Sequence, residues 1–516
     1  MLRGIHFKRL SYKNVIHIFY VIAIIQAQEL VFVIFYLLNT HMITSKNRFL
    51  KYILIAAFGI SLLGCARSMN PDVERGSMFQ FQDGYPEVRM TAIGLLDEQD
   101  NPYISVTSEI VYGSLVYRTI EEQTFAQVTI EIRINEKDGP YSKTSRDQLD
   151  VLTENSDNYQ NQDVFSYQKQ LDVEPGDYVV EVSVTDNSSG RTVVRKTETL
   201  IPDPESPVTN LTSILMSGKI VGQNNGQYTP ITTYDVPSRL DSLKFEFQVT
   251  NNDMEDPLTV NASLLKYEAD TTAARRLSYN NYSSSSIQYQ GIDVRDPEEI
   301  DSNVRRLDQS GSVLIEFKYD LLDRGNYRFE VETVDQEGET IYRARDFAVK
   351  SENYPSVATA REMAAPLVYI MDRDKHEEMM NISDPDSLKE AIDRFWLSNV
   401  GSQNRARSVI NLYYERVEQA NKQFSNFKEG WKTDMGMIFI LFGPPWYVDR
   451  TLNRMQWSYS YDRNDPRRNF YFERSRIPNE YYPFNHYIVQ RSQSYFNLVY
   501  QQTELWRSGA ILESNL

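Results

Sequence analysis

Residues 175–194 read Pro-Gly-Asp-Tyr-Val-Val-Glu-Val-Ser-Val-Thr-Asp-Asn-Ser-Ser-Gly-Arg-Thr-Val-Val, and residues 324–342 read Arg-Gly-Asn-Tyr-Arg-Phe-Glu-Val-Glu-Thr-Val-Asp-Gln-Glu-Gly-Glu-Thr-Ile-Tyr. The two stretches carry Gly, Tyr and Asp at the same spacing. Each contains a run in which apolar and polar side chains alternate, as in a strand with one buried face, and then a polar loop that contains Gly. Each stretch therefore predicts a β-hairpin of an antiparallel sheet.

Similar alternation occurs elsewhere between residues 81 and 352, at 128–134, 243–249 and 313–317. No long helical period competes with it, and Pro202-Asp-Pro-Glu-Ser-Pro207 is typical of a linker. We therefore expect two all-β sandwiches, at 81–205 and 206–352, of the immunoglobulin-like or fibronectin-like kind. The Tyr that follows Gly in each hairpin could close an edge as a tyrosine-corner residue does.

The composition changes after Tyr354-Pro355, and all five tryptophans lie beyond it. Asp384 or Ser383 can cap a helix that begins at Pro385. A second helix is predicted over 404–427, and strands are predicted over 437–442, 456–461 and 469–472. The strand at 437–442 is expected to stop at Gly443-Pro444-Pro445. Residues 353–516 should therefore form a separate α+β domain.

The N-terminal region indicates export and lipidation. Met42 is followed by basic residues, an apolar run over 52–63, and Leu62-Leu63-Gly64-Cys65, the order of a secretory signal with a lipobox. The apolar run is shorter than the roughly 20 residues of a membrane span. We expect a signal peptide at 42–64, acyl chains on Cys65, the only cysteine, and a polar tether at 65–80.

Residues 1–41 do not fit a chain that starts with a signal peptide. Their apolar stretch, 16–38, is interrupted by Gln26, Gln28 and Glu29 and makes a poor span. We interpret 1–41 as a start-site artefact, with translation beginning at Met42. The alternative is a genuine additional helix.

The net charge limits the possible partners. The whole chain has a net charge of −17, and removal of residues 1–64, with seven basic residues and one acidic residue, leaves −23. A polyanion repels nucleic acid and acidic lipid head groups, so nucleic-acid binding is not expected and membrane attachment should depend on the lipid.

Gly430-Trp431-Lys432-Thr433-Asp434, followed by Gly436 and the run to Pro445, is the most distinctive string. Physically it fits a turn: Gly430 could take a positive φ at a helix end, and Thr433 and Asp434 could bond nearby backbone amides. Trp431 would then pack on the helix that carries Phe424. An alternative interpretation places Asp434, with Arg416 or Asp449, in a polar cleft.

This string resembles the GWxTD domain, a family found in envelope proteins of Bacteroidota and related Gram-negative bacteria. The resemblance covers about 360–510 and includes Phe395-Trp396, Trp457 and Trp506-Arg507-Ser508-Gly509. Met435 departs from it, because a basic residue is usual there. Lipidated N-termini and preceding β domains are common in the family, so the resemblance implies architecture and location and no settled activity.

No catalytic motif is recognisable. Only His376 and His486 remain after residue 64, Cys65 would be acylated, and there is no nucleophile elbow, phosphate-binding loop or dinucleotide fingerprint. We therefore predict no cofactor, metal or catalytic residue. Candidate binding residues are aromatic: Trp446, Tyr447, Trp457, Tyr459 and Tyr461. Alternation along strands should turn about half of the aromatic residues in this region inward.

The sequence thus predicts a lipid-anchored envelope protein, in the outer membrane because Ala66 rather than Asp follows Cys65. The leading hypothesis for its function is a non-enzymatic scaffold that binds an envelope protein partner through the C-terminal domain. The competing hypothesis is a glycan-binding or glycan-processing protein that uses an aromatic cleft in that domain.

Overall fold

The structure is a computed structural model that describes residues 73–74, 82, 84–152, 163–220, 226–252, 257–277, 291–335, 337–460, 465, 468–475 and 484–513. All of these belong to one compact unit, 69–516. Cys65, the predicted signal peptide, the proposed start-site segment, the stretch 16–38 and Tyr461 lie outside the described residues. Within the described ranges, the search for a helix long and apolar enough to cross a bilayer found none.

The first β unit consists of two antiparallel sheets over one core. One has the order β2 (Val88–Leu96), β3 (Pro102–Val111), β7 (Val164–Asp172). The other has the order β4 (Arg118–Ile120), β5 (Gln123–Glu136), β8 (Gly176–Asp186), β9 (Arg191–Ile201), with β6 (Ser142–Leu152) also paired to β5. A short 3-10 helix, Tyr112–Ser114, follows β3. Alternate Val and Ile side chains of both sheets fill the shared core, which is the arrangement of a sandwich.

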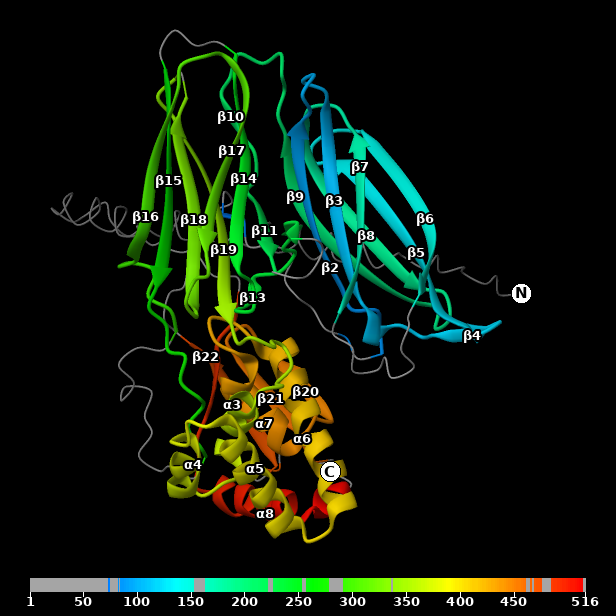
Figure 1. Ribbon diagram of the computed structural model, residues 1–516, viewed down its shortest axis with the longest axis vertical. Helices are drawn as coiled ribbons and strands as arrows, with labels where there is room; N and C mark the ends of the chain where they lie inside the picture. The colour runs from blue at the N-terminus through cyan, green and yellow to red at the C-terminus, as the bar shows by residue number, and fades with distance from the viewer. Residues whose placement is uncertain are drawn as a thin grey trace, which may run out of the picture. The chain divides into compact units, whose positions relative to one another are not determined.

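The second β unit follows the same principle. One sheet contains β15 (Leu258–Tyr267), β16 (Glu298–Leu307), β18 (Gly325–Val334) and β19 (Thr340–Lys350), with β13 (Asp235–Pro237) paired to β19. The other contains β10 (Asn210–Leu211), β11 (Leu215–Lys219), β12 (Thr229–Pro230), β14 (Ser242–Asn251) and β17 (Gly311–Asp320). Stacked rings dominate this core, among them Phe245 and Phe329 with centroids 4.4 Å apart. The mostly β prediction for this half of the chain is confirmed (Figure 1).

The two stretches that repeat Gly, Tyr and Asp form equivalent hairpins, β8–β9 and β18–β19. Tyr178 and Tyr327 are both buried, and the Tyr327 hydroxyl donates to the carbonyl oxygen of Asp323 at 2.7 Å. Asp186 and Asp335 each accept hydrogen bonds from backbone amides of the following loop, which fixes the turn.

The predicted tether contains a short strand. β1 (Val73–Glu74) lies inside 65–80 and pairs in parallel with Ala344 and Arg345 of β19. It thus joins the sheet of the second β unit, although the first β unit follows it in the sequence. The polar composition of this stretch gave no signal for a pairing partner so far along the chain.

The C-terminal region mixes helices and a small sheet, as predicted. Its helices are α3 (Ala360–Ala364), α4 (Arg373–Met380), α5 (Pro385–Val400), α6 (Gln403–Phe424), α7 (Asp434–Phe442) and α8 (Tyr495–Ser508), with 3-10 turns at Ala365–Tyr369, Gly430–Lys432 and Ala510–Leu512. Its antiparallel sheet has the order β20 (Tyr447–Arg450), β21 (Arg454–Ser458), β22 (Asn469–Arg474), β23 (Tyr487–Val489). Asp384 caps α5 through the Ser387 amide at 2.8 Å, as expected.

The predicted strand at 437–442 is wrong, because these residues belong to α7. Every residue from Gly436 to Phe442 is buried, so the run has no polar face and its period cannot distinguish a buried helix from a buried strand. The residues at the two ends of this run favour a helix over a strand. Thr433 caps the first turn, and Gly443 ends the helix with φ of 79°.

Candidate functional site

The motif 430–436 forms the turn between α6 and α7. The Thr433 hydroxyl accepts a hydrogen bond from the Gly436 amide at 2.9 Å and donates to the carbonyl oxygen of Gly430 at 2.7 Å. Ser425 accepts from the Gly430 amide at 2.8 Å. The backbone polar groups of this buried turn thus find side-chain partners, as buried groups must.

The two glycines of the motif are required by close approach. Gly430 has no positive φ, so the sequence-based explanation of this residue was wrong. A Cβ on Gly430 would lie 1.9 Å from the carbonyl oxygen of Ala420, and one on Gly436 would lie 2.0 Å from the carbonyl oxygen of Gly430. The turn therefore packs directly on the α6 backbone, and α7 packs on the turn.

Trp431 is buried between α6 and the 3-10 turn Ala365–Tyr369. Its amide donates to the Asn421 side chain on α6 at 3.1 Å, which places it against the predicted helix. Its carbonyl oxygen accepts from the Tyr369 hydroxyl at 2.8 Å, and its indole nitrogen donates to Glu429 at 3.0 Å. Each polar group of this large residue is satisfied, so Trp431 is an anchor of the fold.

Asp434 forms a buried ion pair with Arg491. Its Oδ1 accepts from Arg491 Nη2 at 3.0 Å, and its Oδ2 accepts from Arg491 Nη1 at 3.1 Å and from the Val489 amide at 2.8 Å. The carboxylate also lies at the N-terminus of α7, where negative charge is favoured. Asp434 thus binds α7 to β23. Neither Arg416 nor Asp449 appears among its bonds, so the predicted cleft with those residues is not formed.

Arg416 serves the other end of α7. It donates to the carbonyl oxygens of Ile440 and Leu441 at 3.1 and 3.4 Å and lies 5.1 Å from the Trp506 ring centre. Burial lowers the pKa of Arg416 to about 10. A cation at the last carbonyl groups of a helix is stabilising. The Trp506 indole donates to the same Leu441 carbonyl oxygen at 3.0 Å.

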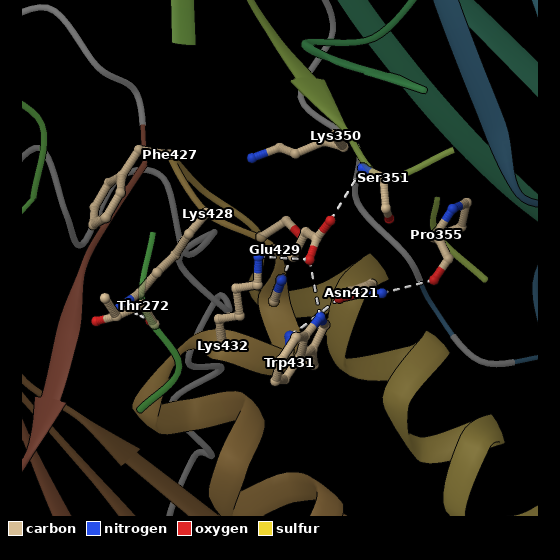
Figure 2. Close-up of polar contacts among 12 residues, drawn as sticks. Thr272, Lys350, Ser351, Pro355, Asn421, Phe427, Lys428, Glu429, Trp431 and Lys432 are labelled. Atoms are coloured by element: carbon tan, nitrogen blue, oxygen red, sulfur yellow. Dashed lines mark hydrogen bonds and ion pairs between the residues drawn. The ribbon is translucent and has the colours of Figure 1, made fainter. Parts of the chain in front are cut away.

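Sequence reasoning missed Glu429, which connects the motif to the second β unit (Figure 2). Its Oε1 accepts from the Ser351 amide at 3.0 Å, directly after β19, while its Oε2 receives the Trp431 indole N–H and lies 3.0 Å from Lys432 Nζ. Burial opposes the ionisation of Glu429, but Lys432 and the Ser351 amide lower its pKa to about 2. Glu429 therefore binds as a carboxylate.

Further bonds join the same two regions. Asn326 on β18 donates to the carbonyl oxygen of Phe427 at 2.9 Å, and Lys428 Nζ donates to that of Thr272 at 3.0 Å. Arg491 Nη2 donates to the carbonyl oxygen of Arg275 at 2.7 Å. These partners are far apart in the sequence, so no local pattern could have indicated them. We call residues 426–429 with Ser351 and Asn326 the junction.

Burial and the charge of Lys428 lower the pKa of His486, beside the junction, to about 4. A histidine in the unfolded chain has a pKa of about 6.5. As the pH falls from about 6.5 to about 4, only the unfolded state takes up this proton, so we expect the free energy of unfolding to fall by at most about 1.4 kcal/mol per pH unit.

Denaturant titrations at a series of pH values test this expectation. In His486→Gln the contribution should be absent, so the difference between the wild type and the variant should shrink as the pH falls through this window. His376 and the carboxylates remain in both proteins and cancel. Parallel stability curves would show that His486 does not titrate as described.

The structure separates the predicted binding aromatics into two groups. Trp457 and Tyr459 are in the core, 3% and 2% exposed, so they are not accessible for binding as predicted. Trp457 packs on Phe424, and the Tyr459 hydroxyl donates to the carbonyl oxygen of Gly443. Both side chains pack in the core that the small sheet shares with the helices.

Trp446 and Tyr447 are exposed, at 36% and 38%. They follow Pro444, which is exposed, and Pro445, which is half-buried. Val448 and Leu452, on the same β20–β21 hairpin, are 42% and 83% exposed. We call Trp446, Tyr447, Val448 and Leu452 the hairpin surface. These are large apolar side chains exposed along one hairpin at the edge of the sheet, with Tyr447 and Val448 on opposite faces of β20. Exposed apolar side chains of this kind often bind other molecules.

In the part of the chain that the structure describes, a search for groups of three or more His, Cys, Asp or Glu side chains close enough to hold a metal found none. The carboxylate of Glu429, whose pKa is lowered, is enclosed by its own hydrogen-bond donors.

Comparison with known proteins supplies one family. The GWxTD domain matches residues 325–508. The matched range begins at the first residue of β18, so it includes the β18–β19 hairpin that carries Asn326 and leads to Ser351. No curated protein matches the chain.

Two solved structures show weak similarity. One is red sea bream transglutaminase, with 11% identity and a TM-score of 0.17 over 51% of this chain and 31% of that chain. The other is a tetra-tandem repeat in the extending region of a large adhesion protein, with 14% identity and a TM-score of 0.14 over 51% of this chain and 49% of that chain. The chain thus spans about a third and about half of these proteins, and such TM-scores define neither fold nor function.

Proposed function

The chain carries a GWxTD domain at residues 325–508, and we propose that it is a lipid-anchored envelope protein whose GWxTD domain binds a protein partner without catalysis. The observation that carries the proposal is the hairpin surface. The motif itself is occupied with internal bonds, so binding is assigned to a part of the domain that is exposed.

The chemistry of the hairpin surface favours a protein partner. Aromatic and aliphatic side chains stand beside Asp449 and Arg450, which are also exposed. A central apolar group with polar residues at its rim is the usual composition of a protein interface, where Trp and Tyr contribute strongly. In this proposal the two β units are immunoglobulin-like supports that present the domain.

A pull-down from detergent-solubilised envelope tests the partner. The tagged full chain is compared with a Val448→Glu, Leu452→Glu variant, and Val304→Glu is the matched control because Val304 is 64% exposed on β16, in another sheet. We expect specific envelope proteins to be recovered with the wild type and the control and to fall at least about tenfold with the variant, since a buried charge at an interface costs several kcal/mol.

Point variants are preferable to removal of residues 353–516, because that deletion would also expose Asn326, Lys350 and Ser351, which the junction buries. Equal recovery with all three proteins would exclude the hairpin surface. If no specific protein is recovered, the scaffold proposal loses its main support. The adjacent exposed rings of Trp446 and Tyr447 then favour the glycan hypothesis, and the purified protein should be tested against peptidoglycan and surface glycans.

The lipid anchor is tested separately. The order of basic, apolar and Leu-Leu-Gly-Cys segments supports acylation of Cys65. We expect growth with a radiolabelled fatty acid to label the wild type and not Cys65→Ser, and we expect the wild type to sediment with the outer membrane. Label in the Cys65→Ser protein would refute this assignment.

A further inference from the structure

Lys350 and Asp235 form a buried pair between two neighbouring parallel strands. Asp235 is the first residue of β13 and Lys350 is the last residue of β19. β13 and β19 pair with Asp235 opposite Ala348 and Pro237 opposite Lys350. Lys350 Nζ lies 3.3 Å from Asp235 Oδ1, and the two side chains are 4% and 12% exposed. A primary amine and a carboxyl group are thus held in contact, with most water excluded.

Neighbouring groups fix the orientation of both side chains. The Tyr354 hydroxyl donates to Asp235 Oδ2 at 3.1 Å, and Lys350 Nζ donates to the carbonyl oxygen of Asn426 at 2.6 Å. The Tyr234 ring centre lies 5.9 Å from Lys350 Nζ, and Tyr234 belongs to a small apolar cluster with Ala348 and Phe427. Two reacting groups held in contact in a dry site gain a large effective concentration.

The surroundings also favour the uncharged forms. Burial lowers the pKa of Lys350, although Asp235 and Glu429 oppose this, and Lys432 adds to it. Burial raises the pKa of Asp235, and Glu429 adds to this effect, while Lys350 and Tyr354 oppose it. Both shifts favour transfer of a proton from the amine to the carboxyl group. A neutral amine has the lone pair that a nucleophile needs.

We propose that Lys350 and Asp235 condense to an intramolecular amide that links β13 to β19 covalently. The Lys350 Nζ lone pair attacks Asp235 Cγ, while the Tyr354 hydroxyl polarises Oδ2. The bond between Cγ and Oδ1 then breaks, and Oδ1 leaves as water with the carboxyl proton and one proton from Nζ. No oxidant, reductant or further reactant is needed.

The link would fasten β13 of the second β unit to β19, which lies within the range matched by the GWxTD domain. β19 ends at Lys350, and the next residue, Ser351, binds Glu429 of the junction. A covalent bond at this point would hold the end of β19 to the start of β13 when a bound partner pulls on the domain. It would serve the proposed function without depending on it.

Peptide mapping of the full chain tests the proposal. The purified protein is unfolded in denaturant and digested with trypsin. An amide at Lys350 blocks cleavage there, so we expect one branched peptide that contains 220–239 and 346–361 and is lighter than the two separate peptides by one water molecule. Recovery of 220–239 and 346–350 only as linear peptides would overturn the proposal, as would a link from Lys350 to any other acid.

The molecule contains a matched control pair. Lys428 Nζ lies 3.7 Å from Asp270 Oδ2 and is also buried. There, however, the charge of Lys428 and the bonds from Thr272 outweigh burial and lower the pKa of Asp270, so its carboxylate stays ionised. We expect no branched peptide from this pair; one at Lys428 would mean that contact alone suffices and would overturn the argument from charge state.

Two variants assign the bond. Asp235→Ala should restore cleavage after Lys350. Asp235→Asn should give the same branched peptide, because the amine then displaces ammonia instead of water. Since the primary result comes from the wild-type protein, it does not depend on whether the variants fold. A wild-type link that persists in Asp235→Ala would exclude Asp235 as the partner.

Discussion

Replacement of Asp434 by alanine is expected to lower the free energy of unfolding by about 3 to 5 kcal/mol, because it leaves Arg491 buried without its carboxylate. Both side chains are less than a tenth exposed, at 8% for Asp434 and 6% for Arg491. The variant also removes the acceptor of the Val489 amide. Denaturant unfolding of the purified protein, followed by tryptophan fluorescence, measures the change, since all five tryptophans lie in the affected region.

The control is an exposed ion pair in the small sheet of the same domain. Glu473 pairs with Arg454 at 3.2 Å, but these side chains are 46% and 72% exposed, so Glu473→Ala should change stability by less than about 1 kcal/mol. The double variant Asp434→Leu, Arg491→Met should recover part of the loss, because it removes the uncompensated charge. Equal effects of Asp434→Ala and Glu473→Ala would contradict the structural role of the motif aspartate.

The second large effect is expected for Gly430→Ala. The added methyl group would meet the carbonyl oxygen of Ala420 at 1.9 Å, and this is helix backbone that cannot rotate away. Either the turn or α6 must shift, which also disturbs the bond between Trp431 and Asn421. Overpacking of this kind costs about 1 to 3 kcal/mol and sometimes more. The same unfolding measurement applies.

Gly139→Ala is the matched glycine control. The three atoms nearest to a Cβ at Gly139 all belong to the end of the Glu136 side chain, which can move, and residue 139 is exposed. Its replacement should change stability by less than about 0.5 kcal/mol. If Gly430→Ala is equally mild, the motif glycine is not required by close packing.

Local patterns were sufficient for the β units and for α5. The β8–β9 and β18–β19 hairpins carry their own strand period, turn Asp and loop Gly, so each can be recognised from about twenty neighbouring residues. The same is true of α5, where Asp384, Pro385 and the apolar face lie within one segment. In these elements, the residues that contact one another are also close together in the sequence.

α7 shows where a local pattern is ambiguous. Its apolar run fits a strand and a helix equally well, and the decision depends on burial from all sides, which tertiary contacts create. The Thr433 cap and Gly443 were visible in the sequence. Read together as a start and a stop, they would have indicated a helix.

The junction and the pair of Asp434 with Arg491 could not be predicted in this way. Glu429 and Ser351, Asp434 and Arg491, and Asn326 and Phe427 are each more than 50 residues apart. An acidic residue before Gly-Trp is an ordinary surface residue by composition, and only the folded chain encloses it. For the same reason the sequence indicated a turn at Gly430 and not the close contact with Ala420 that excludes a side chain there.

The pairing of β1 with β19 determines how a mechanical load enters the molecule. A pull transmitted from upstream of Val73 meets β19 at Ala344 and Arg345. A few residues further along the chain, Ser351 binds Glu429, which directly precedes the GWxTD motif. While that pairing holds, the load passes into β19 without running along the covalent chain of the first β unit. That unit stays joined to the same path from the side, through the bonds of Leu96 with Gln248 and the buried ion pair of Glu87 with Lys422.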